Sequence, residues 1–384
     1  MTESKKPLQV IYNLCLFYWG NLLTSLFLRN FIGELAFIVG VVIIMVALFR
    51  LSRIQGYGLV GGSICLAIAF LLSLWKVPEN MALYSMMECS DKEYVRRASE
   101  FLIRMQKWQM AEQIIVASSL VLKLTGCILW MRNKVFAEVK KMFYFLFADL
   151  LIGMLALSIR SFECGSNAVI YLSFLYYIAH ALAMMALGVM VYRLGKGVGV
   201  LWKDRKYYAF VLCFSIGCCY LPFLFVGYMT YQIFLLAVCI VFLYGIKIWS
   251  SINKQRNVFY WWLCVGGLMV GIIGFRIYGA FVVVPPQLFY CVFVICGMLA
   301  AGYGMMARGE RDRRVFWGLG ALSVLLIPLT FFYSGQMTFF TIAWIWAWVW
   351  LPLWMWCLNV WVKKYFHFVE EKSEEVAGNI SNRK

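Results

Sequence analysis

Histidine and acidic residues are scarce in this chain, and their scarcity argues against several kinds of site. Only two histidines, His180 and His367, occur among 384 residues, and aspartate and glutamate together number 18. Zinc and iron centres draw on clusters of histidine, cysteine and carboxylate ligands, and haem commonly uses paired axial ligands. Because one histidine lies in an apolar run and the other in a charged tail, the sequence predicts no metal site and no cofactor.

Charged residues of both signs are also few, at 14% of the chain, whereas soluble domains contain about 25%. Hydrophobic residues make up 64%, against about 45–50% in soluble domains, and the mean hydropathy is +0.80. This composition argues against a soluble catalytic, nucleotide-binding or DNA-binding domain. The net charge of +17 lies mainly in short loops between apolar runs, so it indicates membrane topology and predicts no nucleic-acid partner.

The apolar runs are about 18–25 residues long, which is the length that an α-helix needs to cross a bilayer. Strands of a membrane β-barrel would instead alternate apolar and polar residues over about 10 positions. The sequence therefore predicts an all-α, polytopic membrane protein with about twelve transmembrane helices. Their expected ranges are 8–28, 33–50, 57–75, 111–131, 142–159, 168–192, 207–226, 229–246, 258–275, 285–306, 315–333 and 338–360. For the range 8–28, which contains Asn13 and Asn21, the alternative is a helix that lies flat in the membrane interface.

Lysine and arginine are distributed unevenly between alternate loops. If the N-terminus is cytoplasmic, the inner segments contain 22 Lys and Arg residues and the outer segments contain nine, six of them in the long segment 76–110. Because basic residues mark cytoplasmic loops, this asymmetry predicts that both termini are cytoplasmic. The compartment is interpreted as a bacterial inner (cytoplasmic) membrane, with membrane lipids as the surrounding partners.

Residues 1–362 are expected to form a single transmembrane bundle, and the charged tail 363–384 is expected to be disordered. The largest part outside the predicted spans is the outer segment 76–110. Apolar residues recur in this segment every three or four positions, at Tyr94, Ala98, Phe101, Met105 and Trp108. That spacing predicts an amphipathic helix on the outer surface, which is a candidate contact for a protein partner.

Three ionisable residues deep inside predicted spans are candidates for a coupling or substrate site, because a charge within the membrane is costly and usually functional. Lys123 and Asp149 belong to one predicted hairpin and are expected to pair, either to fix helix packing or to couple protons or substrate. His180 lies near the middle of the next span. Its alternatives are a neutral hydrogen bond between helices, which is favoured, and a proton relay.

The order of these residues is similar to that of a known family. Lys123, then Asp149 at the end of "FLFAD", then His180 in "YIAH" follow one another on three successive predicted spans. This order resembles the lysoplasmalogenase family of membrane lipid hydrolases. The resemblance implies a membrane-embedded hydrolase that uses Asp149 and His180. That family also has a second acidic motif in its later spans, whereas predicted spans seven to twelve of this chain contain no acidic residue.

Tryptophan is concentrated in the last predicted span, 338–360. On a helix, Trp346, Trp350 and Trp354 form one stripe. Aromatic stripes usually pack between helices, which is the favoured interpretation. The alternative is a lipophilic surface for a lipid tail, a polyprenyl chain or a quinone.

Two of the 13 cysteines, Cys89 and Cys164, lie outside the predicted spans, and both are in outer segments. Disulfides persist on the outer side of such a membrane. The sequence predicts a disulfide between them, which would tie 76–110 to the loop between the fifth and sixth spans. The alternative is that each thiol is buried in its own loop.

Three functions remain open from the sequence. The favoured one is a transporter or flippase for a hydrophobic or lipid-linked substrate, coupled at Lys123, Asp149 and His180. The second is a non-enzymatic sensor, scaffold or assembly factor whose partner contacts 76–110. The third is a membrane-embedded lipid hydrolase that uses Asp149 and His180. A non-enzymatic role is favoured over an enzymatic one.

Overall fold

The computed structural model describes residues 6–25, 31–54, 58–78, 80–81, 91–161, 166–197, 205–220, 230–279, 290–307, 309–332 and 349. Every regular element in these ranges is a helix, which confirms the predicted all-α class. In chain order they are α1 (Lys6–Thr24), α2 (Phe31–Ser52), α3 (Val60–Ser73), α5 (Asp91–Met131), η2 (Lys134–Val139), α6 (Lys140–Ser161), α7 (Ser166–Gly197), α8 (Arg205–Tyr220), α10 (Thr230–Asn253), α11 (Arg256–Gly279), α12 (Tyr290–Met306) and α13 (Glu310–Phe332).

Seven helical segments in the described part of the chain are long and apolar enough to cross a bilayer. They are Gly33–Ser52, Val60–Pro78, Met110–Met131, Lys134–Ser158, Phe174–Lys196, Phe234–Asn253 and Arg256–Gly274. Two shorter apolar helical segments are Tyr208–Gly217 and Val294–Met306. Helices of this length and composition indicate an integral membrane protein.

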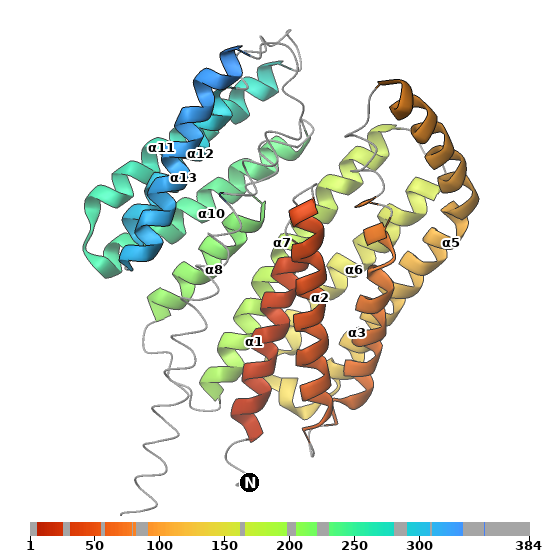
Figure 1. Cartoon of the computed structure of the whole chain (residues 1–384). Helices are drawn as coiled ribbons and strands as arrows, with labels where there is room; N and C mark the ends of the chain where they lie inside the picture. Colours follow the sequence, from red (N-terminus) through yellow and green to blue (C-terminus); the bar gives the residue numbers. More distant parts are fainter. Residues whose placement is uncertain are drawn as a thin grey trace, which may run out of the picture. The chain divides into compact units, whose positions relative to one another are not determined.

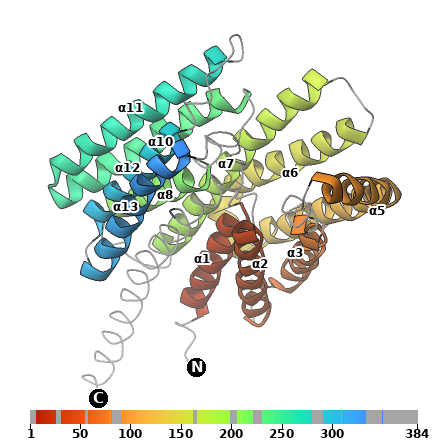
Figure 2. The ribbon, with the colours of Figure 1, turned by 45° about the horizontal axis from the view of Figure 1, so that its top comes forward.

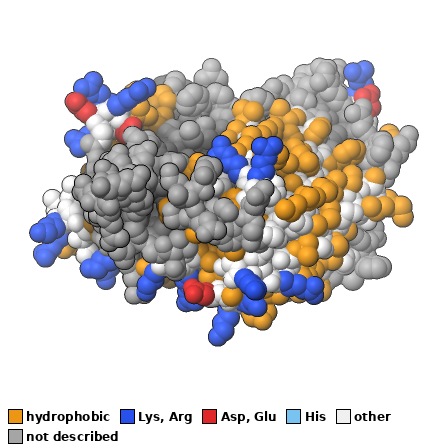
Figure 3. Space-filling model, turned by 90° about the horizontal axis from the view of Figure 1, so that it is seen from below, with side chains coloured by type: hydrophobic (Ala, Val, Ile, Leu, Met, Phe, Trp, Pro, Cys, Tyr) orange, Lys and Arg blue, Asp and Glu red, His pale blue; other side chains and the backbone are white. Residues whose placement is uncertain are grey.

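Large apolar side chains are exposed along one face of several helices. On α2 the exposed residues are Leu35, Val39, Val42, Val46 and Phe49. On α3 they are Val60, Ile64, Ile68 and Leu71. Because each set recurs every three or four residues, it forms a single stripe along its helix. Figure 3 shows hydrophobic side chains over broad areas of the described surface. Surfaces of this kind suit lipid tails, since a soluble monomer rarely exposes them to water.

The chain folds into two compact units. Unit 1 comprises Met1–Trp202 and Val226–Leu235, and unit 2 comprises Lys203–Phe225 and Leu236–Lys384. In unit 1, α1 pairs with α2, α3 with α5 and α6 with α7 (Figures 1 and 2). Further contacts join α2 to α3, α5 to α6 and α7 to α1, so the six helices close a ring. The single bundle expected for 1–362 stays a prediction.

The first helix, α1, packs lengthwise in this ring against α2 and α7. Its buried side chains include Leu14, Tyr18, Trp19 and Leu22. The amides of Asn13 and Asn21 donate to the carbonyl oxygens of Gln9 and Phe17, one turn earlier, at 2.8 Å each. These bonds satisfy the amide nitrogens within the helix itself, although the buried Oδ1 atom of Asn13 has no hydrogen-bond partner among the described residues. α1 is therefore a packed member of the ring and not a helix lying on its surface.

Helix α5 joins most of the predicted amphipathic segment to the predicted fourth span. It runs without a break over Asp91–Met131, and its apolar span begins only at Met110. A helix of 41 residues is about 60 Å long, roughly twice the hydrocarbon thickness of a bilayer. Its first half, which contains most of the predicted amphipathic segment, therefore continues the spanning helix directly.

Unit 2 is held together by aromatic side chains, one from each of five helices. Phe214 of α8 stacks on Phe242 of α10, with ring centroids 5.2 Å apart. Phe242 meets Trp262 of α11 at 5.2 Å, and Trp262 meets Tyr303 of α12 at 4.9 Å. Tyr303 then contacts Phe316 of α13 at 5.8 Å. Edge-to-face and offset-stacked rings at these separations add stability beyond burial alone.

Two predictions fall on parts of the chain outside the described residues. They are the disulfide between Cys89 and Cys164 and the stripe formed by Trp346, Trp350 and Trp354. Both stay predictions.

Candidate functional site

A cavity of about 100 Å³ lies within the ring of unit 1. Side chains of α1, α3, α5, α6 and α7 line it, and most of them are apolar. The three ionisable residues selected from the sequence, Lys123, Asp149 and His180, all lie on its wall. The cavity has room for a few water molecules but is smaller than the roughly 300 Å³ of a small-molecule pocket.

Asp149 of α6 and His180 of α7 form the central contact of this site. The distance from His180 Nδ1 to Asp149 Oδ2 is 2.9 Å, and the two side chains are only 21% and 11% exposed. Tyr176, one turn before His180, stacks on the imidazole with ring centroids 5.9 Å apart. The ring of His180 is therefore held by a hydrogen bond at its edge and by an aromatic ring on its face.

Lys123 lies on the same cavity but has a different partner from the one predicted. Its ammonium nitrogen is 4.5 Å from the centroid of the Phe70 ring, in a cation–π contact. No ion pair within 4.0 Å joins Lys123 to Asp149 among the described residues, and the pairing of these two residues stays a prediction. Helices α5 and α6, which carry Lys123 and Asp149, form one hairpin. Lys123 nevertheless points toward α3, whereas Asp149 points toward α7.

The Asp149 carboxylate is only partly satisfied by these contacts. Its Oδ2 atom meets His180, but the buried Oδ1 atom has no hydrogen-bond partner among the described residues. A buried carboxylate oxygen without a partner is costly. Lys123 on the same wall partly compensates this charge, because opposite charges attract over longer distances in an apolar interior than in water.

Ser25 completes the site and is not among the residues predicted from the sequence. Its hydroxyl oxygen lies 2.8 Å from His180 Nε2 and 2.7 Å from the backbone carbonyl oxygen of Asn21. Ser25 directly follows α1 and is 155 positions from His180 in the chain. No sequence pattern links the two residues, so only the packing of α1 against α7 reveals the contact.

The Ser25 contacts allow two protonation states of His180. A serine hydroxyl has one hydrogen atom, which can be donated either to Asn21 or to His180 Nε2. When it is donated to His180, the imidazole is neutral and its Nδ1 hydrogen faces Asp149. When it is donated to Asn21, both imidazole nitrogens can carry hydrogen, and Ser25 accepts from Nε2. Rotation of the Ser25 hydroxyl therefore gives both nitrogens of His180 a hydrogen-bond partner, whether the imidazole is neutral or protonated.

The chain Ser25–His180–Asp149 has the order of a nucleophile, a base and an orienting acid. Two features argue against nucleophilic chemistry here. Ser25 is not among the residues that line the cavity. It also lies at the C-terminal end of α1, where a helix presents carbonyl oxygens and the negative end of its dipole. An oxyanion formed there would face acceptors, whereas acyl transfer needs N–H donors.

Two further acidic residues, one in the first turn of α2 and one in the middle of α5, have nearby polar partners. Glu112 lies 3.8 Å from the Lys76 ammonium nitrogen, and both side chains are accessible. Glu34 is only 8% exposed, and it accepts a 2.8 Å hydrogen bond from the Asn80 amide. No group of three or more His, Cys, Asp or Glu residues within the described ranges could hold a metal ion.

Comparison with protein-family models, curated proteins and solved structures finds no match to this chain. The interpretation of the site therefore depends on its own geometry.

Proposed function

We propose that this protein is a proton-coupled transporter or flippase for a hydrophobic or lipid-linked substrate, with Lys123, Asp149 and His180 as its coupling site. The observation that carries the proposal is the hydrogen-bonding of His180, which has a partner on each nitrogen in both of its protonation states. Histidine changes charge within the physiological pH range more readily than any other side chain. A proton taken up at His180 would lie on Nε2, facing the Ser25 hydroxyl, and the resulting positive charge would alter the balance of charge with Asp149 and Lys123.

The setting of these residues favours coupling over the two alternatives. A scaffold has no need of ionisable groups inside its spans, where each is costly. A hydrolase that uses Asp149 and His180 would need room for a lipid beside them, and the cavity of about 100 Å³ is small for that. A hydrolase that used Ser25 as its nucleophile would also need donors for an oxyanion. A lipophilic substrate is supported by the scarcity of ionisable residues in the later predicted spans, because a pathway for a sugar or an ion is usually lined with polar groups.

The proposal includes about twelve spans, with both termini on the cytoplasmic side of a bacterial inner membrane. The asymmetry of 22 inner against nine outer basic residues supports this orientation. We expect reporters fused after Lys206 and after Lys364 to report a cytoplasmic location, and a tag inserted near Asn80 to be accessible from outside. Alkaline phosphatase and fluorescent-protein fusions measure this directly. An external location for the Lys364 fusion would mean that the number of spans is odd.

The coupling function is tested with the purified protein in liposomes that contain a fluorescent, NBD-labelled phospholipid. We expect an imposed pH gradient to accelerate transbilayer movement of the probe, measured by its accessibility to dithionite. Asp149→Asn and His180→Phe should reduce the gradient-dependent rate to background. Glu138→Gln is the matched control, because it makes the same carboxylate-to-amide change at an exposed residue of η2 outside the cavity.

Two outcomes would contradict the proposal. The first is probe movement that depends on the gradient and is unchanged in Asp149→Asn. The second is covalent labelling of Ser25 by a fluorophosphonate, lost in Ser25→Ala, which would indicate an activated serine and favour the hydrolase. If the pH gradient does not move this probe, the second measurement is the uptake of protons by the protein itself. That uptake should change in Asp149→Asn and His180→Phe but not in Glu138→Gln.

A further inference from the structure

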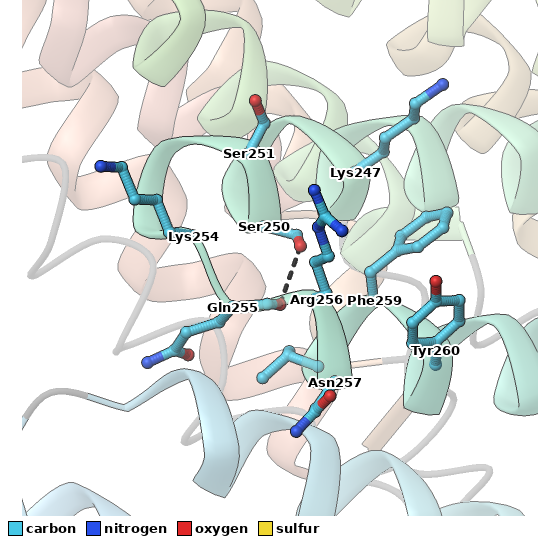
Figure 4. A pocket seen from close by; sticks show the side chains of 10 residues that line it. Lys247, Ser250, Ser251, Lys254, Gln255, Arg256, Asn257, Phe259 and Tyr260 are labelled. Atoms are coloured by element: carbon cyan, nitrogen blue, oxygen red, sulfur yellow. Dashed lines mark hydrogen bonds between the residues drawn. The ribbon is translucent and has the colours of Figure 1, made fainter.

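A second hollow lies in unit 2, at the turn between α10 and α11, and has no part in the proposed coupling site. Its volume is about 1000 Å³, and ten residues between Lys247 and Tyr260 line it. Three of them, Lys247, Lys254 and Arg256, are cationic, and none is acidic. Figure 4 shows Lys247 and Lys254 on either side of the Arg256 side chain. The hollow is therefore positively charged and suited to an anion.

The turn that carries these cations has a defined geometry. Helix α10 ends at Asn253, and the next residue, Lys254, has a left-handed backbone with φ of 54°. The backbone N–H of Gln255 donates to the carbonyl oxygen of Ser250 at 3.2 Å, which is the bond of a Schellman cap. The Ser250 hydroxyl in turn donates to the carbonyl oxygen of Gln255 at 2.8 Å (Figure 4). These two bonds fix the backbone from which Lys254 and Arg256 project.

The lengths of the flanking spans place the hollow at the membrane surface. The apolar spans Phe234–Asn253 and Arg256–Gly274 are separated by only Lys254 and Gln255. A two-residue connection between two helices that cross the bilayer must lie at the level of the lipid headgroups, on whichever side it emerges. The three cations therefore meet the layer that contains lipid phosphates.

We propose that this hollow binds the phosphate of an anionic phospholipid headgroup. The guanidinium group of Arg256 is planar and can donate two parallel hydrogen bonds to phosphate oxygens. The two lysines add positive charge beside it. Arg256 is also the first residue of α11, so the unpaired N–H groups of the first turn favour the same anion. Basic pockets beside transmembrane helices commonly bind anionic lipids in this way.

The lining also distinguishes a lipid from a free phosphate. Val258, Phe259 and Tyr260 add an apolar side to the hollow, continuous with the spanning part of α11. A soluble phosphate would use the cations alone. A phospholipid would use both surfaces, because its glycerol and acyl chains lie beside its phosphate. The volume of about 1000 Å³ also exceeds what one phosphate fills.

The test uses the full-length protein in detergent and measures lipid binding by native mass spectrometry and by thermal unfolding. We expect phosphatidylglycerol to bind and stabilise the protein, and phosphatidylcholine to have a much weaker effect. Each cation near the surface contributes about five-fold to affinity, so Lys247→Gln/Lys254→Gln/Arg256→Gln should weaken phosphatidylglycerol binding by about 100-fold. The control Lys134→Gln/Lys140→Gln/Lys141→Gln removes the same charge from equally exposed residues outside the hollow and should have little effect.

Each other outcome has a defined meaning. An equal loss of binding in the two triple variants would overturn the proposal, because it would mean that net charge alone attracts the lipid. Stabilisation by inorganic phosphate that matches phosphatidylglycerol, and competes with it, would assign the hollow to a soluble anion and overturn the lipid as its ligand. If the triple variant does not fold, Arg256→Gln alone should weaken binding about five-fold, and an unchanged affinity would overturn the proposal.

Discussion

Replacing Asp149 by leucine is expected to lower the free energy of unfolding by about 3–5 kcal/mol, and replacing His180 by phenylalanine should have a comparable effect. Each change leaves the partner of a 2.9 Å contact without its hydrogen bond, in side chains that are at most 21% exposed. Both new residues are apolar and of similar size to those they replace. The loss therefore measures the stranded polar group more than a cavity.

The double variant Asp149→Leu/His180→Phe should be less destabilised than the sum of the two single variants, by up to about 3 kcal/mol. Replacing a buried polar pair by apolar residues of similar volume is often nearly neutral, because neither partner is left unsatisfied. Ser25 keeps its hydrogen bond to the Asn21 carbonyl oxygen in these variants. Unfolding in mixed detergent micelles, followed by circular dichroism, provides the free energies. Additive losses would contradict an Asp149–His180 interaction.

Lys123 provides the comparison for this experiment. The Lys123 ammonium lies over Phe70 and not against Asp149. In a double-mutant cycle, the interaction free energy between Lys123→Met and Asp149→Leu should therefore be smaller than that between Asp149→Leu and His180→Phe. An interaction free energy as large as that of the Asp149–His180 pair would mean that Lys123 and Asp149 form the main pair.

The second large effect is expected where α1 crosses α2, at Gly20 and Gly40. A Cβ atom on Gly40 would lie 2.8 Å from the backbone oxygen of Gly20 and 2.9 Å from Thr24 Cγ2. A Cβ atom on Gly20 would likewise lie 2.8 Å from the backbone oxygen of Gly40. Backbone atoms cannot move aside as a flexible side chain can, so the two helices would have to separate. Small residues commonly allow such close approach between membrane helices.

We expect Gly40→Ala to lower the free energy of unfolding by about 1–3 kcal/mol, which is the usual cost of overpacking. Alanine is intrinsically favoured over glycine in a helix by about 1 kcal/mol, so the loss would have to overcome that gain. Gly267→Ala on α11 is the control, because no described atom lies within 4 Å of its added Cβ. That variant should be neutral or slightly more stable. Equal effects of the two substitutions would contradict a close α1–α2 contact.

The helical class and the candidate site residues could be predicted from the sequence because they depend on local properties. A run of about 20 apolar residues must satisfy its own backbone in lipid, and a helix does so whatever its neighbours are. Ionisable residues inside such runs stand out for the same reason. Lys123, Asp149 and His180 were selected in this way, and all three lie on one cavity.

The partners within the site depend on long-range packing and could not be predicted. Ser25 lies 155 residues from His180, and only the packing of α1 against α7 brings them together. The contact of Lys123 with Phe70 could not be predicted either, because shared depth in a hairpin does not determine which way each side chain points. That direction depends on the rotation of α5 and α6 about their axes, which contacts with α3 and α7 determine.

By itself, the sequence determined that the chain forms long apolar helices and which of their few charges lie within them. Both depend on composition and hydropathy, which need no knowledge of the neighbouring helices. That basic residues gather in alternate loops stays a prediction, because it depends on the number of spans. The tertiary structure decided that α1 lies in the ring, that Asp149 binds His180, and that Ser25 completes the site. The physical reason is that hydrogen bonds act over about 3 Å, so partners are chosen only when the helices have packed.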